Sequence, residues 1–379
     1  MRILQVIDTF NTGGAEALLV DLCLRWKRDG LSPEVFVLHD GKGTHQTRLQ
    51  DAGINVTVSS RPGLRSPGHV VDLAAAISRE RFDLVHVHLH PAQLWAAMAL
   101  RVTRGAPPGV TTEHSTWNRR RAHRWCRPID RWMYSQFRLA ICIGSAARNT
   151  LEAWLGPAVC PTCVVANGID FTRFRRSVTP ARLPDAVNGA PAILCVGSLT
   201  ASKDQETLVR AIAEVEGVHL LLAGDGPLRQ AVQSAARRAR VDSRVHFLGI
   251  RHDIPELIAA ADLYVQPSRV DGFCLATLEA MAGGRPVIAS DIPGLSDVVG
   301  NSGILFPVGD HRRLAECIGS LLHDSALRQK LSARGVNRAQ QYDIEKTAAQ
   351  YGRIFHDVVN NTNLADAQVP AAYRLGREA

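Results

Sequence analysis

The sequence lacks any long apolar run. No segment approaches the roughly 20 uninterrupted apolar residues that cross a bilayer, and the nearest, residues 139–147, is much too short. The first residues lead directly into a strand-like pattern, without a basic leader, an apolar segment and a small-residue cleavage site. We therefore expect a cytoplasmic protein, with a peripheral position on the inner face of a membrane as the alternative.

Cysteine is also scarce. The 379 residues include 8 cysteines at irregular spacing, which excludes a disulfide scaffold and suits reduced thiols. Only Cys160 and Cys163 form a close pair, in Cys-Pro-Thr-Cys. A lone pair lacks the second pair of ligands that a structural zinc site needs. We expect a solvated loop there, with a metal or redox role as the alternative.

Low-complexity segments and internal repeats are missing as well. Hydrophobic residues make up 46% of the chain and charged residues 21%, a balance that favours globular cores over disorder. At about 150 residues per domain, this length predicts two or three domains. The net charge of +8 favours anionic partners such as phosphates, nucleic acid or an acidic membrane face, without choosing among them.

Strand and helix patterns alternate from the start of the chain. Residues 2–7 form an apolar strand pattern that leads through a glycine-containing loop into helical spacing from Ala15 to Trp26. The same unit recurs with a strand at 34–39, and with a strand at 84–88 before a helix around 94–100. This alternation predicts a parallel sheet covered by helices on both faces.

A second strand and helix series follows a break. Three prolines and a glycine interrupt both periodicities and predict a linker at 179–191. The pattern then predicts strands at 192–196, 219–223, 244–248, 264–266 and 287–289, and helices at 204–215, 228–240 and 254–261. We expect an N-terminal domain at 1–178, a C-terminal domain at 192–345, and a helix and tail at 346–379 that pack back toward the first domain. The tail from Val369 is expected to fray.

Two glycine loops each follow the first strand of a series. Gly13 and Gly14 let the backbone approach a ligand, and the helix behind them carries a partial positive charge that suits a phosphate. Simple turn chemistry explains them equally well, and the loop is not the Gly-x-Gly-x-x-Gly pattern of nicotinamide enzymes. In the second series Gly197 and Ser198 precede Lys203, which is predicted at the start of a helix with its ammonium in an interdomain cleft. A surface lysine is the alternative.

The segment from Gln266 to Gly284 is the most informative. A strand ends, a loop holds Asp271 and Gly272, and a helix begins near Cys274 and carries Glu279. Exposed amides at the helix start can meet a pyrophosphate or a sugar, and the two carboxylates can accept hydrogen bonds from hydroxyl groups. Since carboxylates have no reason to bind phosphate, they indicate a polyhydroxylated ligand beside it.

Taken in order, these segments resemble the retaining, nucleotide-sugar-dependent glycosyltransferases of the GT-B fold, group 1 (family 4). The resemblance spans nearly the whole chain and is carried by Gly13-Gly14, Asn167-Gly168-Ile169-Asp170, Val196-Gly197 with Lys203, Ala223-Gly224-Asp225-Gly226-Pro227-Leu228, Phe247-Leu248-Gly249 and the block from Asp271 to Glu279. Several weak motifs in the right order are more specific than any one. The resemblance implies an α/β fold of two Rossmann-like parallel-sheet domains that face a central cleft.

The resemblance implies a role for each matched position. Glu279 would bind the ribose hydroxyls. Asp271 would hold the transferred sugar and the phosphates together with the amides of Gly272, Phe273, Cys274 and Leu275. Lys203 and the loop of Gly13 and Gly14 would offset the charge of the departing diphosphate. The remaining donor-side positions are Gly197, Ser198, Gly224 and Arg251, whose backbone would face the base.

The histidines suggest an acceptor side. His114, in Thr-Glu-His-Ser, matches the family histidine near the reacting sugar, so the catalytic candidates are His114, Lys203 and Asp271. His86, His88 and His90 alternate along a strand end and share one face, with His114 nearby. They could line the site, pack in the core or bind a metal. The resemblance implies no bound metal and no cofactor besides the donor.

Three positions depart from the family pattern. Asp271 is shorter than the usual glutamate by about 1.5 Å. Ser198 stands where an arginine is often found, so Lys203 would carry more of the leaving-group stabilisation. Asp204 stands where glycine is frequent.

The densest basic and aromatic stretch, Arg119 to Tyr134, is called the basic segment below. Arginines with tryptophans beside them suit an anionic membrane interface. A solvated arginine face with its aromatics in the core is the alternative. Because no recognised nucleic-acid module accompanies the segment, we expect no nucleic-acid partner.

We therefore predict a retaining glycosyltransferase. It would move a hexose or N-acetylhexosamine from a nucleoside-diphosphate sugar to a glycan or lipid-linked acceptor hydroxyl in surface polysaccharide or glycolipid assembly. A UDP-sugar is the preferred donor and a GDP-sugar the alternative. The rival functions are a nucleotide-sugar epimerase and an inactive, basic membrane- or RNA-binding protein.

Overall fold

The computed structural model describes residues 1–361 except 11–12, 41–44, 157, 177 and 188. The chain divides into two compact units. Unit 1 comprises Met1–Gly168 together with the residues from Ile344 onward, and unit 2 comprises Ile169–Asp343. The tail predicted to fray from Val369 lies outside the described residues.

Unit 1 is built on a seven-stranded sheet in the order β3-β2-β1-β4-β5-β6-β7. Its strands are β1 (Arg2–Thr9), β2 (Ser32–His39), β3 (Val56–Val58), β4 (Leu84–His88), β5 (Gly109–Glu113), β6 (Leu139–Cys142) and β7 (Thr162–Val164). Every neighbouring pair is parallel. All residues of the central strand β4 are buried, as expected for a sheet covered on both faces.

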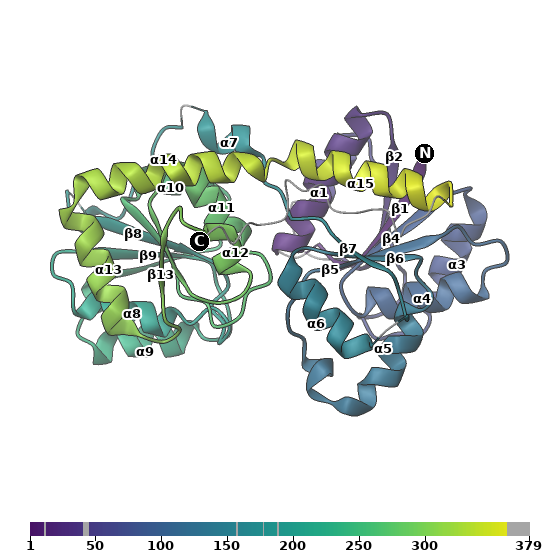
Figure 1. Cartoon of the computed structure of the whole chain (residues 1–379), viewed down its shortest axis with the longest axis horizontal. Coiled ribbons are helices and arrows are strands. Elements are labelled where there is room, and N and C mark those ends of the chain that lie inside the picture. Colours follow the sequence, from purple (N-terminus) through teal and green to yellow (C-terminus); the bar gives the residue numbers. More distant parts are fainter. Residues whose placement is uncertain (11–12, 41–44, 157, 177, 188, 362–379) are drawn as a thin grey trace. The chain divides into compact units, whose positions relative to one another are not determined.

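Helices cover both faces of this sheet (Figure 1). Helices α1 and α15 lie on one face, and α3, α4, α5 and α6 lie on the other (Figure 1). The helical segments are α1 (Gly14–Arg28), α2 (His45–Asp51), α3 (His69–Arg79), α4 (Ala92–Val102), η1 (Arg119–Ala122), η2 (Arg124–Cys126), α5 (Arg127–Tyr134), α6 (Ser145–Leu155) and α15 (Ile344–Val359).

Helix α15 joins unit 1 through an aromatic contact with α1. The indole Nε1 of Trp26 donates to the carbonyl of Ala348 at 3.0 Å. The Trp26 ring also packs 5.3 Å from the ring of Phe355, centroid to centroid. Both rings are fully buried, so the C-terminal helix completes the core of a unit built otherwise from the first 168 residues.

Unit 2 repeats the plan with six parallel strands in the order β10-β9-β8-β11-β12-β13. The strands are β8 (Ala192–Val196), β9 (His219–Ala223), β10 (Val245–Gly249), β11 (Leu263–Gln266), β12 (Val287–Ser290) and β13 (Ile304–Phe306). The helical segments are α7 (Phe171–Arg175), η3 (Asp185–Val187), α8 (Gln205–Ala213), α9 (Arg229–Arg238), η4 (Asp242–Arg244), α10 (Ile254–Ala260), α11 (Leu275–Ala282), α12 (Leu295–Val299), α13 (His311–His323) and α14 (Ser325–Gln341).

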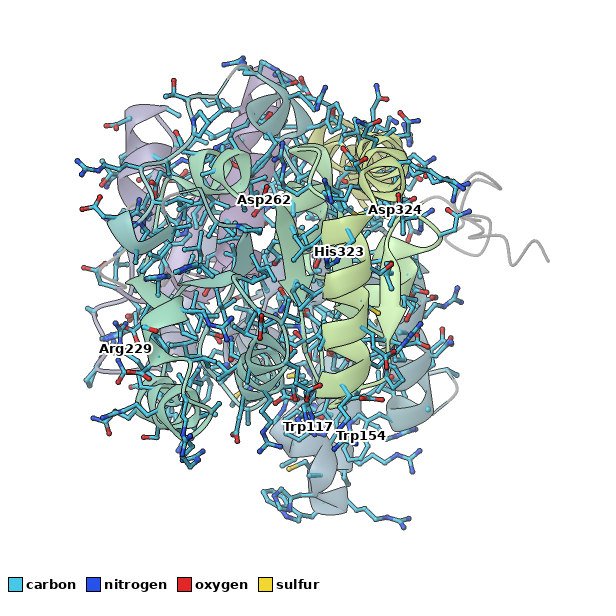
Figure 2. The ribbon with its side chains drawn as sticks, turned by 90° about the vertical axis from the view of Figure 1, so that its left-hand side faces the viewer. Trp117, Trp154, Arg229, Asp262, His323 and Asp324 are labelled. Atoms are coloured by element: carbon cyan, nitrogen blue, oxygen red, sulfur yellow. The ribbon has the colours of Figure 1, made fainter. Side chains whose placement is uncertain are left out.

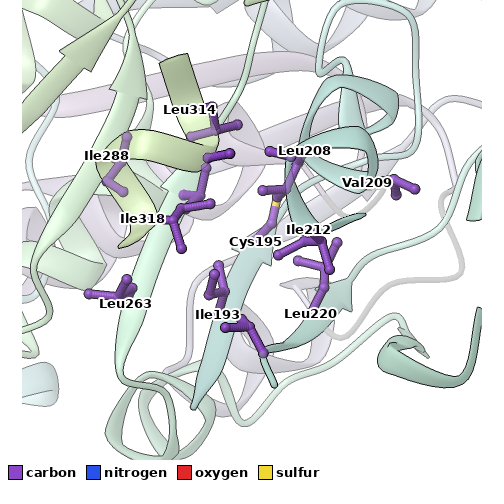
Figure 3. Close-up of a cluster of buried hydrophobic side chains, with 14 of the residues drawn as sticks. Ile193, Cys195, Leu208, Val209, Ile212, Leu220, Leu263, Ile288, Leu314 and Ile318 are labelled. Atoms are coloured by element: carbon purple, nitrogen blue, oxygen red, sulfur yellow. The ribbon is translucent and has the colours of Figure 1, made fainter. Parts of the chain in front are cut away.

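One core layer of unit 2 lies between the sheet and helices α8, α9 and α13. Figure 3 shows Ile193 and Leu220 from the strands packing with Leu208 and Ile318 from the helices. Figure 2 shows the end of α13 at His323, where Asp324 follows. The Asp324 carboxylate accepts a hydrogen bond from the amide of Leu327 at 2.8 Å, which caps α14.

The predicted linker at 179–191 lies within unit 2. The amide of Ala181 donates to the carbonyl of Glu256 at 2.9 Å, which holds this segment against α10. The chain passes between the units after Gly168 and again after Asp343. Prolines therefore mark an irregular path along unit 2 rather than the point where the chain changes unit.

The predicted fold class of two parallel-sheet α/β units is confirmed. The strands at 84–88, 192–196 and 219–223 have the predicted bounds, because short apolar runs of this kind become buried central strands. Unit 1 has more strands than were predicted. The strands β3, β5, β6 and β7 were not predicted. Two of them, β3 and β7, have three residues each, too few to show a period, and β5 and β6 have only five and four residues.

Candidate active site

The centre of the candidate site in unit 2 is an ion pair between Lys203 and Asp271. Lys203 Nζ lies 2.5 Å from Asp271 Oδ2. Only 21% of the lysine side chain and 11% of the aspartate side chain are exposed. Burial by itself lowers the pKa of Lys203, but Cys274 and Asp271 outweigh this effect and hold that pKa above its usual value. A charged ammonium is therefore paired with a carboxylate in a largely buried position.

The sheet order explains why these two residues meet. Lys203 follows β8 and Asp271 follows β11, and the two strands are neighbours in the sheet. The carboxyl ends of parallel strands lie at one edge, which is where α/β sheets bind ligands. The lysine lies in a turn just before α8, which begins at Gln205, one residue after the predicted helix start at Asp204. Asp204 has a φ of +46°, in the left-handed region that favours glycine.

A chain of hydrogen bonds holds Asp271 from inside the sheet. The hydroxyl of Tyr264 donates to Gln266 Oε1 at 2.7 Å, Gln266 Nε2 donates to Ser268 Oγ at 2.8 Å, and Ser268 Oγ donates to Asp271 Oδ2 at 3.3 Å. Tyr264, Gln266 and Ser268 are all fully buried. These positioning residues were not predicted from the sequence. The available signal was a polar residue at every second position of a buried strand.

Helix α11 follows the loop of Asp271 and Gly272 after two further residues. Phe273 and Cys274 are buried, and Leu275 is the first helical residue. The first amides of a helix have no partner within it and carry a partial positive charge, so this end of α11 suits an anion. Glu279 is partly buried on the second turn. The structure thus places the predicted donor-binding residues from Asp271 to Glu279 in one continuous loop and helix.

Gly294 supports this loop from the next strand-to-helix turn. It has a φ of +92°, and a Cβ atom there would lie 2.6 Å from the carbonyl oxygens of both Asp271 and Gly272. Both the backbone angle and the close approach require glycine. This residue was not predicted from the sequence, because nothing local links positions 23 residues apart.

The predicted glycines at 197 and 224 contact each other. A Cβ atom on Gly224 would lie 2.1 Å from the carbonyl oxygen of Gly197. The Gly224 amide donates to the carbonyl of Gly249 at 2.7 Å. Close backbone packing therefore accounts for these glycines without any ligand. Ser198 follows Gly197, and the side chain of Arg251 is engaged in an ion pair with Asp253.

The first glycine loop lies in unit 1, at the start of α1. The carboxylate of Glu16 fills the space beside Gly13, where an added Cβ atom would lie 2.2 Å from Glu16 Oε2. Gly14 is the first residue of α1. Asp8, at the end of β1, accepts a hydrogen bond from the amide of Ala92 at 2.6 Å. Burial raises the pKa of Asp8 to about 7. Asn11 and Thr12 of this loop lie outside the described residues.

His114 follows β5 and contacts the buried His88 of β4. His88 Nδ1 lies 2.9 Å from His114 Nε2. Burial lowers the pKa of His114 to about 4, so the ring is neutral near pH 7. His90, predicted to share a face with His86 and His88, lies beyond the strand and is exposed.

The metal alternatives find no support in the part of the chain that the structure describes. No group of three or more histidine, cysteine or acidic side chains there could hold a metal ion. The ring nitrogens of His86 and His88 are engaged in hydrogen bonds with other side chains. Cys163 is buried in β7 instead of lying in a solvated loop, and the Cys160 thiol contacts the carbonyl of Phe137.

The basic segment divides its side chains between surface and core. Met133 and Tyr134 are buried, whereas Trp125 is 70% exposed and Trp132 is 40% exposed. Trp117, labelled in Figure 2, is exposed just before the segment. The alternative that places all its aromatics in the core is therefore wrong for the two tryptophans. Among the described residues, no helix is long and apolar enough to cross a membrane.

Two family models match successive parts of the chain. The model described as "Glycosyltransferase Family 4" matches residues 12–173, and the model described as "Glycosyl transferases group 1" matches residues 190–324. The matches follow the two units and together cover about three quarters of the chain.

Individual relatives share this organisation. The chain is 27% identical over 320 residues to N-acetyl-alpha-D-glucosaminyl L-malate synthase of Bacillus anthracis, covering 81% of this chain and 84% of that protein. It is 28% identical over 291 residues to phosphatidyl-myo-inositol mannosyltransferase of Mycobacterium leprae, covering 74% and 75% of the two proteins. The crystal structure of Anabaena HepE in complex with UDP and glucose has a TM-score of 0.81 at 23% identity, covering 94% of this chain and 100% of that chain.

Proposed function

The chain belongs to the GT-B glycosyltransferases of group 1 and family 4, and from this premise we propose that it is a retaining hexosyl- or N-acetylhexosaminyltransferase. Its donor is a nucleoside-diphosphate sugar, preferably a UDP-sugar, with a GDP-sugar as the alternative. Its acceptor is a hydroxyl of a glycan or a lipid-linked sugar in surface polysaccharide or glycolipid assembly. The donor binds unit 2 and the acceptor binds unit 1.

The observation that carries this proposal is the buried ion pair beside the start of α11. Lys203 supplies the charge that a diphosphate needs, and Asp271 supplies an acceptor for sugar hydroxyls. Glu279, one turn into the same helix, is assigned to the ribose hydroxyls. The preference for uridine is supported by the fold similarity to HepE, which is in complex with UDP in its crystal structure. The lipid acceptor is supported by the similarity to the phosphatidyl-myo-inositol mannosyltransferase.

The proposed reaction is a front-face displacement. The acceptor oxygen attacks the anomeric carbon, and the bond between that carbon and the phosphate oxygen breaks on the same face. The acceptor proton passes to the leaving diphosphate. Lys203 and the first amides of α11 stabilise the diphosphate charge as it develops. No covalent nucleophile is required, and the sugar keeps its anomeric configuration.

Binding and transfer assays test the assignment. UDP and GDP are titrated into the full chain by calorimetry, and transfer from UDP-hexoses is followed by mass spectrometry, with the product linkage assigned by NMR. Lys203→Ala should lower turnover by orders of magnitude, and Glu279→Ala should mainly weaken nucleotide binding. Lys330→Met, at an exposed lysine of α14, is the control. A folded Lys203→Ala variant with normal turnover would contradict the role of this lysine.

The same assays separate the rival functions. An epimerase converts the donor sugar without any acceptor, so the donor alone would yield a new sugar nucleotide. An inactive membrane- or RNA-binding protein would show salt-sensitive binding to anionic polymers and no affinity for sugar nucleotides. An inverted product anomer would contradict the retaining mechanism while leaving the transferase assignment in place.

The basic segment supports a peripheral position on an anionic membrane. Trp125, Ile129 and Trp132 are exposed, and Arg124 lies among them at the surface. Exposed tryptophans beside arginines suit the interface of an acidic bilayer. Sedimentation with anionic vesicles should fall when Trp125 and Trp132 are both changed to alanine. Equal sedimentation of this double variant, or of the wild type with zwitterionic vesicles, would contradict membrane binding through this surface.

A further inference from the structure

A chain of hydrogen bonds runs from His114 into the centre of the unit 1 sheet. His114 Nε2 contacts His88 Nδ1 at 2.9 Å, and His88 Nε2 contacts Gln5 Oε1 at 3.2 Å. His86 Nδ1 contacts the same oxygen of Gln5 at 2.8 Å. Beyond it, His86 Nε2 contacts Thr112 Oγ1 at 2.8 Å, and Thr112 Oγ1 contacts the hydroxyl of Tyr351 at 3.2 Å. Of these residues only His114 is exposed to any extent, and all the others are fully buried.

Burial keeps the three imidazoles neutral. It lowers the pKa of His86 and of His88 well below the usual value, and the neighbouring histidines lower it further. The pKa of His114 is lowered to about 4 by burial. A neutral imidazole has one N–H donor and one bare nitrogen that accepts. The position of one proton along this series of hydrogen bonds therefore restricts the position of the next.

The side-chain carbonyl of Gln5 fixes all of these protons. It can only accept, so the two nitrogens that face it, His86 Nδ1 and His88 Nε2, must both carry hydrogen. His88 Nδ1 is then bare and accepts from His114 Nε2. His114 therefore carries its proton on Nε2, and its Nδ1 is bare.

We infer that Gln5 is a positioning residue that sets the tautomer of His114 through His88, so that His114 presents an unprotonated Nδ1. This nitrogen accepts a hydrogen bond from a hydroxyl and cannot donate one to a phosphate. The bearing of this tautomer on sugar transfer rests on the proposed function, because only there does His114 face a substrate hydroxyl. The tautomer itself does not depend on that function.

The opposite orientation of the Gln5 amide would move the hydrogen of each imidazole to the other ring nitrogen. Its nitrogen would donate to both rings, His88 would donate from Nδ1, and His114 would carry its proton on Nδ1. That arrangement leaves the Gln5 oxygen, and one hydroxyl proton of the Thr112 and Tyr351 pair, without a partner among the described residues. The observed orientation leaves one group, Gln5 Nε2, without a partner among the described residues. The observed orientation gives a partner to every ring nitrogen that takes part in these hydrogen bonds, and to the hydroxyls of Thr112 and Tyr351.

NMR of the full chain labelled with [¹⁵N]histidine tests the inference directly. Long-range ¹H–¹⁵N spectra distinguish a protonated Nε2 from a protonated Nδ1, and a His114→Gln variant identifies the signals of His114. The wild type should show His114 protonated on Nε2. Gln5→Met removes the carbonyl, so the ratio of the two His114 tautomers should change by about fivefold, the effect of one buried hydrogen bond. Protonation of His114 on Nδ1 in the wild type would overturn the inference.

One further variant separates a directed effect from general loosening. Gln93→Met removes another buried glutamine of unit 1, which bonds to Thr111 outside this hydrogen-bond network, and should leave the His114 tautomer unchanged. An equal change in Gln93→Met, or no change in Gln5→Met, would overturn the role of Gln5.

A transfer assay on the same proteins keeps the two proposals apart. If His114 faces the reacting sugar, Gln5→Met should lower kcat several-fold while the KM for the donor changes little. Loss of the tautomer preference with unchanged kcat would leave Gln5 as the determinant of the tautomer and would contradict the assignment of His114 to the proposed reaction.

Discussion

The ion pair of Lys203 and Asp271 can be dissected by a double-mutant cycle with Lys203→Met and Asp271→Asn. Both substitutions keep the approximate size of the side chain and remove its charge. The two groups lie 2.5 Å apart, and most of each side chain is buried. Ser268 Oγ also donates to Asp271, but at the longer distance of 3.3 Å. Each charge is therefore compensated mainly by the other.

The magnitude follows from this burial. Removing one partner of a fully buried pair costs about 3–5 kcal/mol, because the remaining charge is left uncompensated. About a fifth of the Lys203 side chain is exposed, so water recovers part of that loss and we expect about 2 kcal/mol for each single variant. The double variant leaves no buried charge and should be no less stable than either single variant. The coupling energy should then be about 2 kcal/mol.

Thermal unfolding of the full chain measures the cycle. For a unit of this size, 2 kcal/mol corresponds to a fall in Tm of about 4–8 °C. All 6 tryptophans precede residue 155 and so belong to unit 1. Circular dichroism should therefore be used to follow unit 2, with tryptophan fluorescence as the control for unit 1. Strictly additive single effects would refute the view that these two charges compensate each other.

Nucleotide affinity gives a second measurement, in which the two substitutions should have opposite effects on UDP binding. Lys203→Met should weaken UDP binding by about tenfold or more, the effect of losing a charged hydrogen bond. Asp271→Asn should not weaken UDP binding and should strengthen it, because it releases the ammonium and removes a negative charge near the diphosphate. The same variant should lose sugar transfer. Equal weakening of UDP binding by both variants would refute these separate roles.

Two more perturbations test the strand ends. Burial raises the pKa of Asp8 to about 7, whereas an unfolded aspartate ionises near pH 4. The free energy of unfolding should therefore fall as pH rises between about 4 and 7. Asp8→Asn should remove that fall, and urea unfolding at pH 8 should show a gain of about 2–4 kcal/mol. Gly294→Ala should displace the Asp271 loop, and calorimetry should show UDP binding weakened at least tenfold. Gly217 also has a positive φ but has open space around it, so the control Gly217→Ala should lower stability without weakening UDP binding.

The sequence was sufficient for the parts of the fold and site that depend on local pattern. Apolar runs predicted the central strands, and the acidic and glycine residues from Asp271 to Glu279 predicted a continuous loop and helix. Gly197 and Gly224 were assigned to the donor side from the resemblance, and that role stays a prediction. Their close backbone contact was not predicted, because it depends on how neighbouring strands place their loops.

The supporting residues could not be predicted for a physical reason. Gln5 stands in the apolar run of β1, and Gln266 stands at the end of β11, where a single polar residue looks like an interruption of the strand. Their partners come from other strands, so their roles appear only when the sheet order is known. The proline-rich segment at 179–191 shows the opposite error, since a strong local break carried no information about where the chain changes unit.

Both units hold their candidate groups in the same physical way. In unit 2 a buried chain begins at Tyr264 and ends on Asp271, and in unit 1 a buried chain passes through Gln5 and ends on His114. Apolar residues at these inner positions would pack more favourably than polar groups that must all be paired. Their presence in the central strands therefore favours orientation of the site over stability. Apolar replacements at these positions should disturb the orientation of Asp271 and His114 more than they lower the stability of the fold.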